Sequence, residues 1–157
     1  MKKIVIALSL FFVVIIGAVI FQNFIKNNSL FLKTPSVTIK GHKFKLYIAK
    51  NPKDQQIGLS KYNNLPQDYG MLFPFEKADY YSFWMKEMKF PIDIIYIRDN
   101  QIVTILKNVP VPKTKDESIP VYKPAQPADK VLEVNAGISE KYNFKEKDEV
   151  KYENLGN

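Results

Sequence analysis

Hydrophobic positions divide the chain into an apolar N-terminal run and a longer part in which short apolar stretches alternate with polar turns. Ile4 to Phe21 is almost entirely apolar and follows Lys2 and Lys3. Beyond it, short runs with alternating apolar and polar residues are typical of strands that bury one face. Proline, glycine, asparagine and aspartate separate these runs. The pattern predicts a β-rich domain behind an apolar segment.

The predicted elements are eight short strands and two short helices. Strands are predicted at residues 37–39, 44–48, 71–75, 81–86, 92–97, 101–106, 131–134 and 149–152. One helix is predicted from Pro52 to about Ser60, because Asn51 before Pro52 is a helix-start signature. The other is predicted from Ile138 to Tyr142. Apolar residues occupy both faces of 92–97 and 101–106, which predicts strands inside a closed or covered sheet.

Three polar segments are predicted to connect these elements. Lys40, Gly41 and His42 are expected in a hairpin turn, with His42 as a solvated turn residue. Residues 76–79 are expected to form a polar turn after the strand at 71–75. Residues 109–128 contain too many prolines for a central strand or a helix, so they predict a long loop at the rim of the domain, where it could act as a lid.

The apolar N-terminal run predicts a transmembrane helix, because about 18 residues span roughly 27 Å as a helix. It is longer than the usual apolar region of a signal peptide, and no A-x-A-like cleavage site follows it, so an anchor is favoured over a cleaved signal. The lysines before it should stay cytoplasmic, which places the domain outside the cytoplasm. If the segment is cleaved, the domain is secreted.

The expected organisation is an N-terminal membrane anchor or uncleaved signal (1–25), a linker (26–35), a β-rich domain (36–152) and a tail (153–157). The sequence of 157 residues carries a net charge of +7. This positive charge is spread along the chain and favours anionic membrane surfaces or acidic envelope polymers, while nucleic-acid binding gains no support. With no cysteine and one histidine, a zinc site is not expected, and neither a metal nor another cofactor is predicted.

Two carboxylates are the candidate catalytic residues. Asp93 lies in a two-sided apolar strand, so it needs a cation or several hydrogen-bond donors, for which Lys86, Lys89 and backbone N–H groups are candidates. It is interpreted either as a general acid or base with a perturbed pKa, or as a structural carboxylate that fixes the turn after Pro91. Alternation assigns Glu133 to a rim or solvent position. If the two strands are neighbours, Asp93 and Glu133 could form an acid/base or metal pair.

The central aromatic residues suggest a ligand-binding groove. Alternation buries Phe83 and Met85 together and turns Trp84 and Lys86 the other way. A groove with Trp84, Lys86 and Asp93 would suit a sugar ring or a peptide segment, with stacking below and polar contacts at the edge. Core packing alone is the competing interpretation of these aromatics.

A series of short motifs matches, in order and spacing, those of a known family. The matching positions are 58–59, 65–66, 70–73, 75, 83–86, 91, 93–95, 127–128, 131–133 and 135–137. These positions, spread over roughly residues 36–152, resemble the DUF192 family. The resemblance implies a small β-rich domain with a barrel-like sheet, commonly secreted or envelope-attached in bacteria and archaea, and it implies no activity. The sequence departs from the family pattern at Ser60, at Lys147, and at Glu87 and Met88, where Asn and Thr are usual.

These observations together predict a mainly β (α+β) domain with a small barrel-like antiparallel or mixed sheet and one or two short helices, preceded by a transmembrane helix. The favoured function is non-catalytic binding of an envelope glycan, peptide or protein partner through Trp84, Lys86, Asp93, Glu133 and Asn135. One alternative is a carboxylate-based hydrolase or lyase using Asp93 and Glu133. Another is an accessory protein of an envelope complex, which would present a flat apolar patch.

Overall fold

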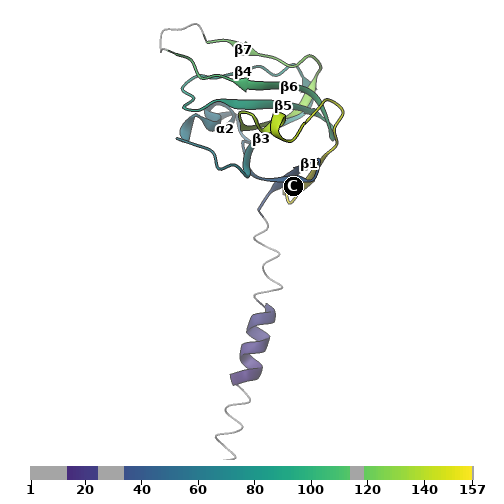
Figure 1. The fold of residues 1–157 in the computed structure, drawn as a ribbon. Coiled ribbons are helices and arrows are strands. Elements are labelled where there is room, and N and C mark those ends of the chain that lie inside the picture. The colour runs from purple at the N-terminus through teal and green to yellow at the C-terminus, as the bar shows by residue number, and fades with distance from the viewer. Residues whose placement is uncertain (1–13, 25–33, 114–118, 157) are drawn as a thin grey trace, which may run out of the picture. The chain divides into compact units, whose positions relative to one another are not determined.

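The computed structural model describes residues 14–24, 34–113 and 119–156 (Figure 1). The chain separates into two units, Met1–Thr34 and Pro35–Asn157. In the first unit, residues 14–24 form a helix with exposed side chains. Among the residues that the structure describes, no helix is long and apolar enough to cross a membrane. The transmembrane helix predicted over 1–25 is therefore not found among them, and its residues 1–13 and 25 lie outside the described ranges, as do residues 26–33 of the predicted linker.

The second unit is mainly β with few short helices, as predicted (Figure 1). Its elements are β1 (Ser36–Ile39), β2 (His42–Ile48), α2 (Pro52–Ile57), the 3-10 helix η2 (Gly58–Lys61), β3 (Tyr69–Asp79), β4 (Phe83–Trp84), β5 (Ile92–Arg98), β6 (Gln101–Val109), β7 (Val121–Tyr122), β8 (Ala128–Asn135), α3 (Ile138–Lys141) and β9 (Val150–Glu153).

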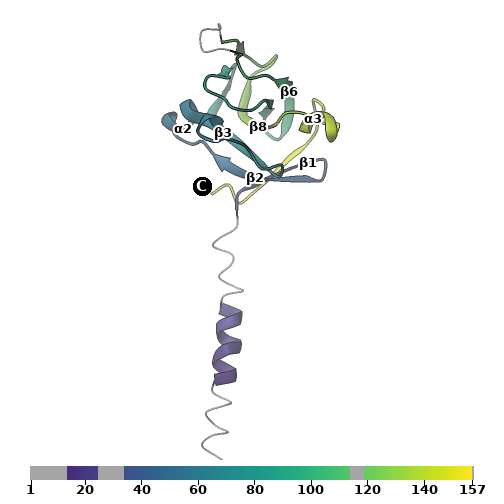
Figure 2. The ribbon, with the colours of Figure 1, turned by 60° about the vertical axis from the view of Figure 1, so that its left-hand side comes forward.

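One curled, half-barrel sheet contains seven of these strands in the order β6-β5-β8-β3-β2-β1-β9. The β2–β3 pair is parallel and the other pairs are antiparallel, so the sheet is mixed, as predicted. Figure 2 shows β2, β3, β8 and β6 following the curl. At one corner the outer strands meet, because Ile102 exchanges backbone hydrogen bonds with Lys147 and Asp148. Val150 N–H also donates to Asn100 O.

Both faces of the central strands are buried, which confirms the prediction of a covered sheet. Ile95 and Ile97 on β5 belong to an inner cluster to which every strand of the sheet contributes, so this cluster fills the inside of the curl. Ile94 and Tyr96, which point the other way, belong to an outer cluster with Leu59 of η2. The helices α2 and η2 and the small β4–β7 sheet lie over this outer face. A covered outer face is the setting in which a pocket can form.

Three predicted boundaries are wrong, the first because pairing with a distant strand overrides the local pattern. β3 continues to Asp79, where it pairs with Ala128 of β8 across a register shift, so residues 76–79 are not a turn. His42 belongs to β2 and stacks on the Tyr142 ring, with 3.7 Å between ring centroids. The strand predicted at 81–86 is reduced to β4, two residues long.

The proline-rich segment after β6 is attached to the outer face of the sheet. Its strand β7 pairs with β4, and Trp84 lies opposite Val121. The Tyr96 hydroxyl donates to Tyr122 O at 3.1 Å. These contacts place β7, within the segment predicted as a loop, beside the outer cluster.

Candidate functional site

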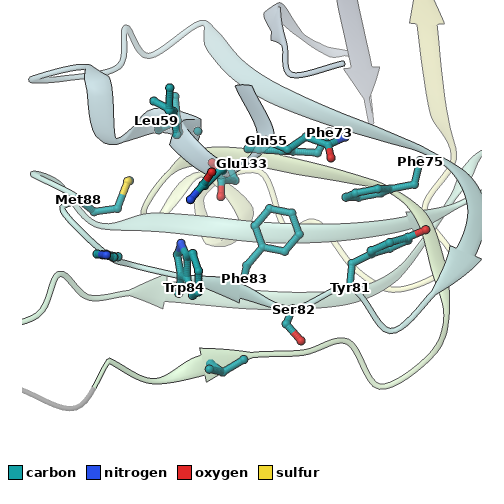
Figure 3. A pocket seen from close by; sticks show the side chains of 15 residues that line it. Gln55, Leu59, Phe73, Phe75, Tyr81, Ser82, Phe83, Trp84, Met88 and Glu133 are labelled. Carbon is teal, nitrogen blue, oxygen red and sulfur yellow. The ribbon is translucent and has the colours of Figure 1, made fainter. Parts of the chain in front are cut away.

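A pocket of about 490 Å³ opens on the outer face of the sheet (Figure 3). Its volume falls in the range of small-molecule sites, roughly 300–1,000 Å³. It lies between α2 and η2 on one side and the segment around β4 on the other, with β3 and β8 behind it. The lining residues are Gln55, Gln56, Ile57, Gly58, Leu59, Phe73, Phe75, Tyr81, Ser82, Phe83, Trp84, Lys86, Met88, Val121 and Glu133.

Local sequence signals position the helical wall of this pocket. The Asn51 side chain caps α2 by accepting a hydrogen bond from Asp54 N–H at 2.9 Å, as the sequence predicts. Gly58 ends the helix with φ 53°, a left-handed conformation that glycine adopts without steric cost. Gln55 then donates from its side chain to Pro74 O at 3.2 Å, which attaches the helix to β3. The helical wall is therefore capped at its start and attached to β3 through Gln55.

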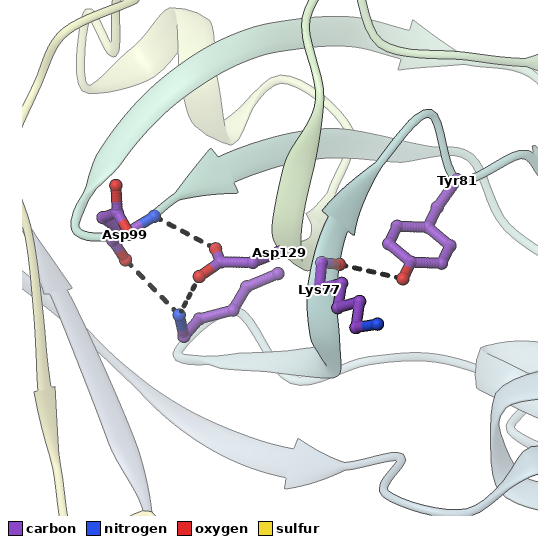
Figure 4. Close-up of polar contacts among 5 residues, drawn as sticks. Lys77, Tyr81, Asp99 and Asp129 are labelled. Atoms are coloured by element: carbon purple, nitrogen blue, oxygen red, sulfur yellow. Dashed lines mark hydrogen bonds and ion pairs between the residues drawn. The ribbon is translucent and has the colours of Figure 1, made fainter.

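Paired aromatic rings form the opposite wall. Phe75 stacks on Tyr81 with 3.6 Å between ring centroids, and Phe73 meets Phe83 edge to face at 5.0 Å. The Tyr81 hydroxyl donates to Lys77 O at 2.9 Å (Figure 4). Figure 3 shows the Phe83 ring near the middle of the pocket, with the stacked pair to one side. Such pairs restrain ring orientation, so the wall is preformed.

Glu133 supplies the buried polar group of the pocket. It projects from the middle of β8, and Figure 3 shows it near Leu59 and Phe83. The residue is 5% exposed, and its Oε2 atom is buried without a hydrogen-bond partner. Burial raises the pKa of its carboxyl to about 8, because desolvation penalises the charged form. The prediction of a rim or solvent position is wrong, since α2, η2 and β4 cover this face.

Asp93 is buried on the opposite face of the sheet. In the β5–β8 register Asp93 pairs with Val134, whereas Glu133 pairs with Ile94, so the two carboxylates point to different sides. Asp93 Oδ1 accepts hydrogen bonds from the backbone N–H groups of Asn108 at 2.8 Å and Gly137 at 3.1 Å. The predicted acid/base or metal pair of carboxylates is therefore wrong.

Backbone N–H groups satisfy the buried Asp93 carboxylate. Oδ2 accepts from Ser139 N–H at 2.7 Å, so the side chain caps the start of α3 from a distant strand. Oδ1 holds the backbone of Asn108 at a bulge in β6, where the β5–β6 register shifts. Of the donors predicted for Asp93, backbone N–H groups are the ones used. The contacts are those of a structural carboxylate, and the backbone that it holds lies at the β6 bulge and after β8, not in the turn after Pro91.

The pocket brings together three of the predicted site residues: Trp84, Lys86 and Glu133. Trp84 is 53% exposed and Lys86 is exposed, while Phe83 and Met85 turn inward, as alternation predicts. Asn135 does not line the pocket. Its side-chain amide instead donates to the backbone oxygens of the loop at residues 65–66, at 2.9 and 3.3 Å.

The residues that α2 contributes to the pocket were not predicted from the sequence. Gln55, Gln56 and Ile57 line the pocket, yet α2 buries none of its side chains, so hydrophobic periodicity carries no signal for them. The Asn51–Pro52 signature was the available signal, and it predicted the helix without predicting what the helix faces. Among the described residues, no group of three or more histidine, aspartate or glutamate side chains could hold a metal ion.

Comparisons with known proteins place this chain in a family. A crystal structure of a protein of unknown function from Novosphingobium aromaticivorans is 30% identical, with a TM-score of 0.64 over 75% of this chain and 83% of that chain. One from Sinorhizobium meliloti, described as a candidate transcription regulator, is 28% identical, with a TM-score of 0.64 over 75% and 91%. No curated protein matches the sequence. The model of DUF192, "Uncharacterized ACR, COG1430", matches residues 35–152, so the chain belongs to the DUF192 family.

Proposed function

We propose that this protein is a non-catalytic binding protein whose pocket takes one ring-sized or side-chain-sized group of an envelope glycan or peptide. The observation that carries the proposal is the buried Glu133 carboxyl in a preformed pocket with aromatic walls. Ligand sites commonly combine apolar walls with a few polar groups that orient the ligand. The exposed Trp84 at the pocket offers a flat surface on which a ring can stack.

The arrangement of carboxylates favours binding over hydrolysis. Two-carboxylate hydrolysis requires the carboxyl groups to face each other across a pocket at about 5 to 10 Å. Asp93 is on the other face of the sheet and its oxygens are occupied by backbone donors. Glu133 is the one carboxylate among the lining residues that the structure describes. A hollow pocket also differs from the flat apolar patch that an accessory protein would present.

Fluorescence of Trp84 tests the binding proposal directly, because it is the only tryptophan of the chain and lines the pocket. Titration of the full-length chain with cell-wall peptides and oligosaccharides should give a saturable change in emission with at least one of them. Trp84→Phe should keep the stacking surface and the binding, measured by calorimetry. Trp84→Ala should weaken binding about 5- to 150-fold, the equivalent of 1–3 kcal/mol.

Tyr80→Ala provides a matched control for the loss of an aromatic ring. Tyr80 is 53% exposed, like Trp84, but does not line the pocket. Its replacement should leave the affinity unchanged. The absence of a saturable response to every fragment, or an equal loss of affinity in Tyr80→Ala and Trp84→Ala, would contradict the proposal.

The proposed location is the outer side of a cell membrane, with the N-terminus in the cytoplasm. Support comes from the sequence, in which Lys2 and Lys3 precede the apolar run from Ile4 to Phe21. The full chain should sediment with membranes, and protease added to intact spheroplasts should digest the domain at residues 36–152. A chain that stays protected in spheroplasts, or is recovered without membranes from the cytoplasm, would contradict this location.

A further inference from the structure

The Glu133 carboxyl lacks the partner that a buried acid normally has. Oε2 is buried and makes no hydrogen bond within the described structure, and Glu133 lines the pocket. An unsatisfied buried polar atom costs about 1–3 kcal/mol. Asp93, one strand away, shows that this fold can satisfy a buried carboxylate with backbone donors. A partner for Glu133 that comes from outside the chain would recover this cost.

The surroundings of Glu133 suit a positive charge. The rings of Phe73, Phe83 and Trp84 line the same pocket, and the faces of aromatic rings attract cations. Lys86 is the one basic side chain among the described lining residues, and it is exposed. No ammonium or guanidinium of the described chain therefore forms an ion pair with Glu133, and the pocket combines one buried carboxyl with an aromatic wall.

We propose that the pocket recognises an organic ammonium group, attached to a ring or an apolar stem, which pairs with the Glu133 carboxylate between the aromatic rings. This inference rests on the proposed binding function and names its ligand chemistry. The ammonium enters with its charge, the carboxyl releases its proton to solvent, and the pair forms a charge-assisted hydrogen bond. A neutral hydroxyl ligand would leave the carboxyl protonated.

Proton release makes the inference measurable. Burial raises the pKa of Glu133 to about 8, so roughly one molecule in ten has the ionised carboxyl at pH 7. Ammonium affinity should therefore rise about tenfold between pH 7 and pH 9. The other titratable groups near Glu133 are Tyr81 and Lys86 in the pocket and Tyr96 on β5, whose pKa is raised by burial and then by Glu133, so its hydroxyl stays neutral.

Cyclohexylamine and cyclohexanol are matched probes, because they share the ring and differ in the charged group. Calorimetry on the full-length chain should show cyclohexylamine binding at least about tenfold more tightly than cyclohexanol at pH 9, since hydrogen bonds to charged groups contribute about 1.5–3 kcal/mol. Titrations at pH 7 in buffers of different ionisation enthalpy should show close to one proton released with the amine and none with the alcohol.

Glu133→Gln should lower the cyclohexylamine affinity by about 10- to 100-fold and change the cyclohexanol affinity little. Glu146→Gln, at an exposed glutamate between α3 and β9, is the matched control and should leave both affinities unchanged. The wild-type measurement of proton release stays informative even if Glu133→Gln folds poorly.

Two further probe pairs distinguish the source of the ammonium group. Glucosamine against N-acetylglucosamine represents an amino sugar, and Nα-acetyl-lysine amide against its Nε-acetylated form represents a peptide side chain. If no amine binds more tightly than its neutral partner, or if no proton is released, the inference is overturned even where a neutral fragment binds. If neither the probes nor any envelope fragment binds, the proposed function fails as well.

Discussion

Asp93 and Glu133 are two buried carboxylates on adjacent, paired strands, and the fold treats them in opposite ways. Asp93 faces the inside of the curl and accepts hydrogen bonds from three backbone N–H groups. Glu133 faces the outer side, where its Oε2 finds no partner among the described residues. The two residues are almost equally buried, since Asp93 is 0% exposed and Glu133 is 5% exposed. Burial alone therefore does not decide the role of a carboxylate. The available donors decide it.

The two carboxylates differ in whether they stabilise the fold or remain available to a ligand. Asp93 joins two backbone segments, at position 108 and at positions 137–139, and its removal would leave three backbone N–H donors without their acceptor. Glu133 Oε2 has no hydrogen-bond partner among the described residues, and the side chain lines a cavity. Asp93 is therefore required for the stability of the fold. The unsatisfied carboxyl of Glu133 lowers stability, and a bound ligand could offset this loss.

Replacing Asp93 should have the largest effect on stability. Asp93→Ala should lower the free energy of unfolding by about 3–5 kcal/mol, because one buried and two partly buried N–H groups lose their acceptor. Urea denaturation followed by circular dichroism measures this loss. Asp68→Ala is the control, since the Asp68–Lys45 ion pair is about half exposed and should contribute less than about 1 kcal/mol. Equal losses in both variants would refute the structural role of Asp93.

The pH dependence of stability should separate the two carboxylates. The pKa of Glu133 is raised from 4.5 to about 8, so between these values the folded state holds a proton that the unfolded state has lost. This stability is full below about pH 4.5 and is lost as the pH rises through about 8. The free energy of unfolding should fall by a few kcal/mol, on the order of 3–4, between pH 5 and pH 8.5.

Glu133→Gln should remove this decline, because its amide does not ionise, and should be more stable than the wild type at pH 8.5. Urea denaturation at a series of pH values provides the measurement. A wild-type decline that persists unchanged in Glu133→Gln would show that other groups cause it. Glu146→Gln, at an exposed position, should retain the wild-type pH profile.

Gly70→Ala tests how tightly β3 packs against the strand that carries Glu133. A Cβ atom at position 70 would lie 2.9 Å from Leu132 Cδ1 and 3.0 Å from Glu133 O. The variant should lose about 1–3 kcal/mol in thermal or urea unfolding, because these contacts must shift. Gly17→Ala, where a Cβ would meet nothing within 4 Å, should leave the unfolding of the β-domain unchanged. A neutral Gly70→Ala would show that the packing is loose.

Glu87 is a third carboxylate for comparison. It is exposed and belongs to neither face of the sheet. Its φ is 59°, a left-handed conformation that costs most residues about 1–2 kcal/mol and that asparagine adopts more readily. Glu87→Asn should therefore stabilise the protein slightly, by about 0.5 kcal/mol, in urea denaturation. The resemblance to DUF192 implies Asn at this position, and a left-handed backbone would favour it. A loss of stability would point to a contact of the Glu87 side chain.

Most strands were predictable because each carries a local signal. Alternation along β2 correctly assigns Phe44 and Leu46 to the core and Lys43 and Lys45 to solvent. Errors appeared where the partner strand lies far away in sequence. The end of β3 has polar residues that resemble a turn, yet β8 pairs with Asp79.

The candidate site was half predictable for a similar reason. Trp84 and Lys86 follow from alternation around Phe83, and both line the pocket. The environment of Glu133 did not follow, because alternation gives the face of a strand and not what covers that face. Here the helix α2 covers the face that carries Glu133, and the residues of α2 that line the pocket show no hydrophobic periodicity.

The sequence by itself determined the β-rich class, the capped helix at Asn51, the strand carrying Asp93 and the resemblance to DUF192, because these depend on neighbouring residues and on motif spacing. Only the tertiary structure decided that β5 and β8 are adjacent and that Asp93 and Glu133 face opposite sides. It also decided which carboxylate receives donors, because those N–H groups come from positions 15, 44 and 46 residues away from Asp93. Donors so distant in the chain are brought to one carboxylate only by the folding of the sheet.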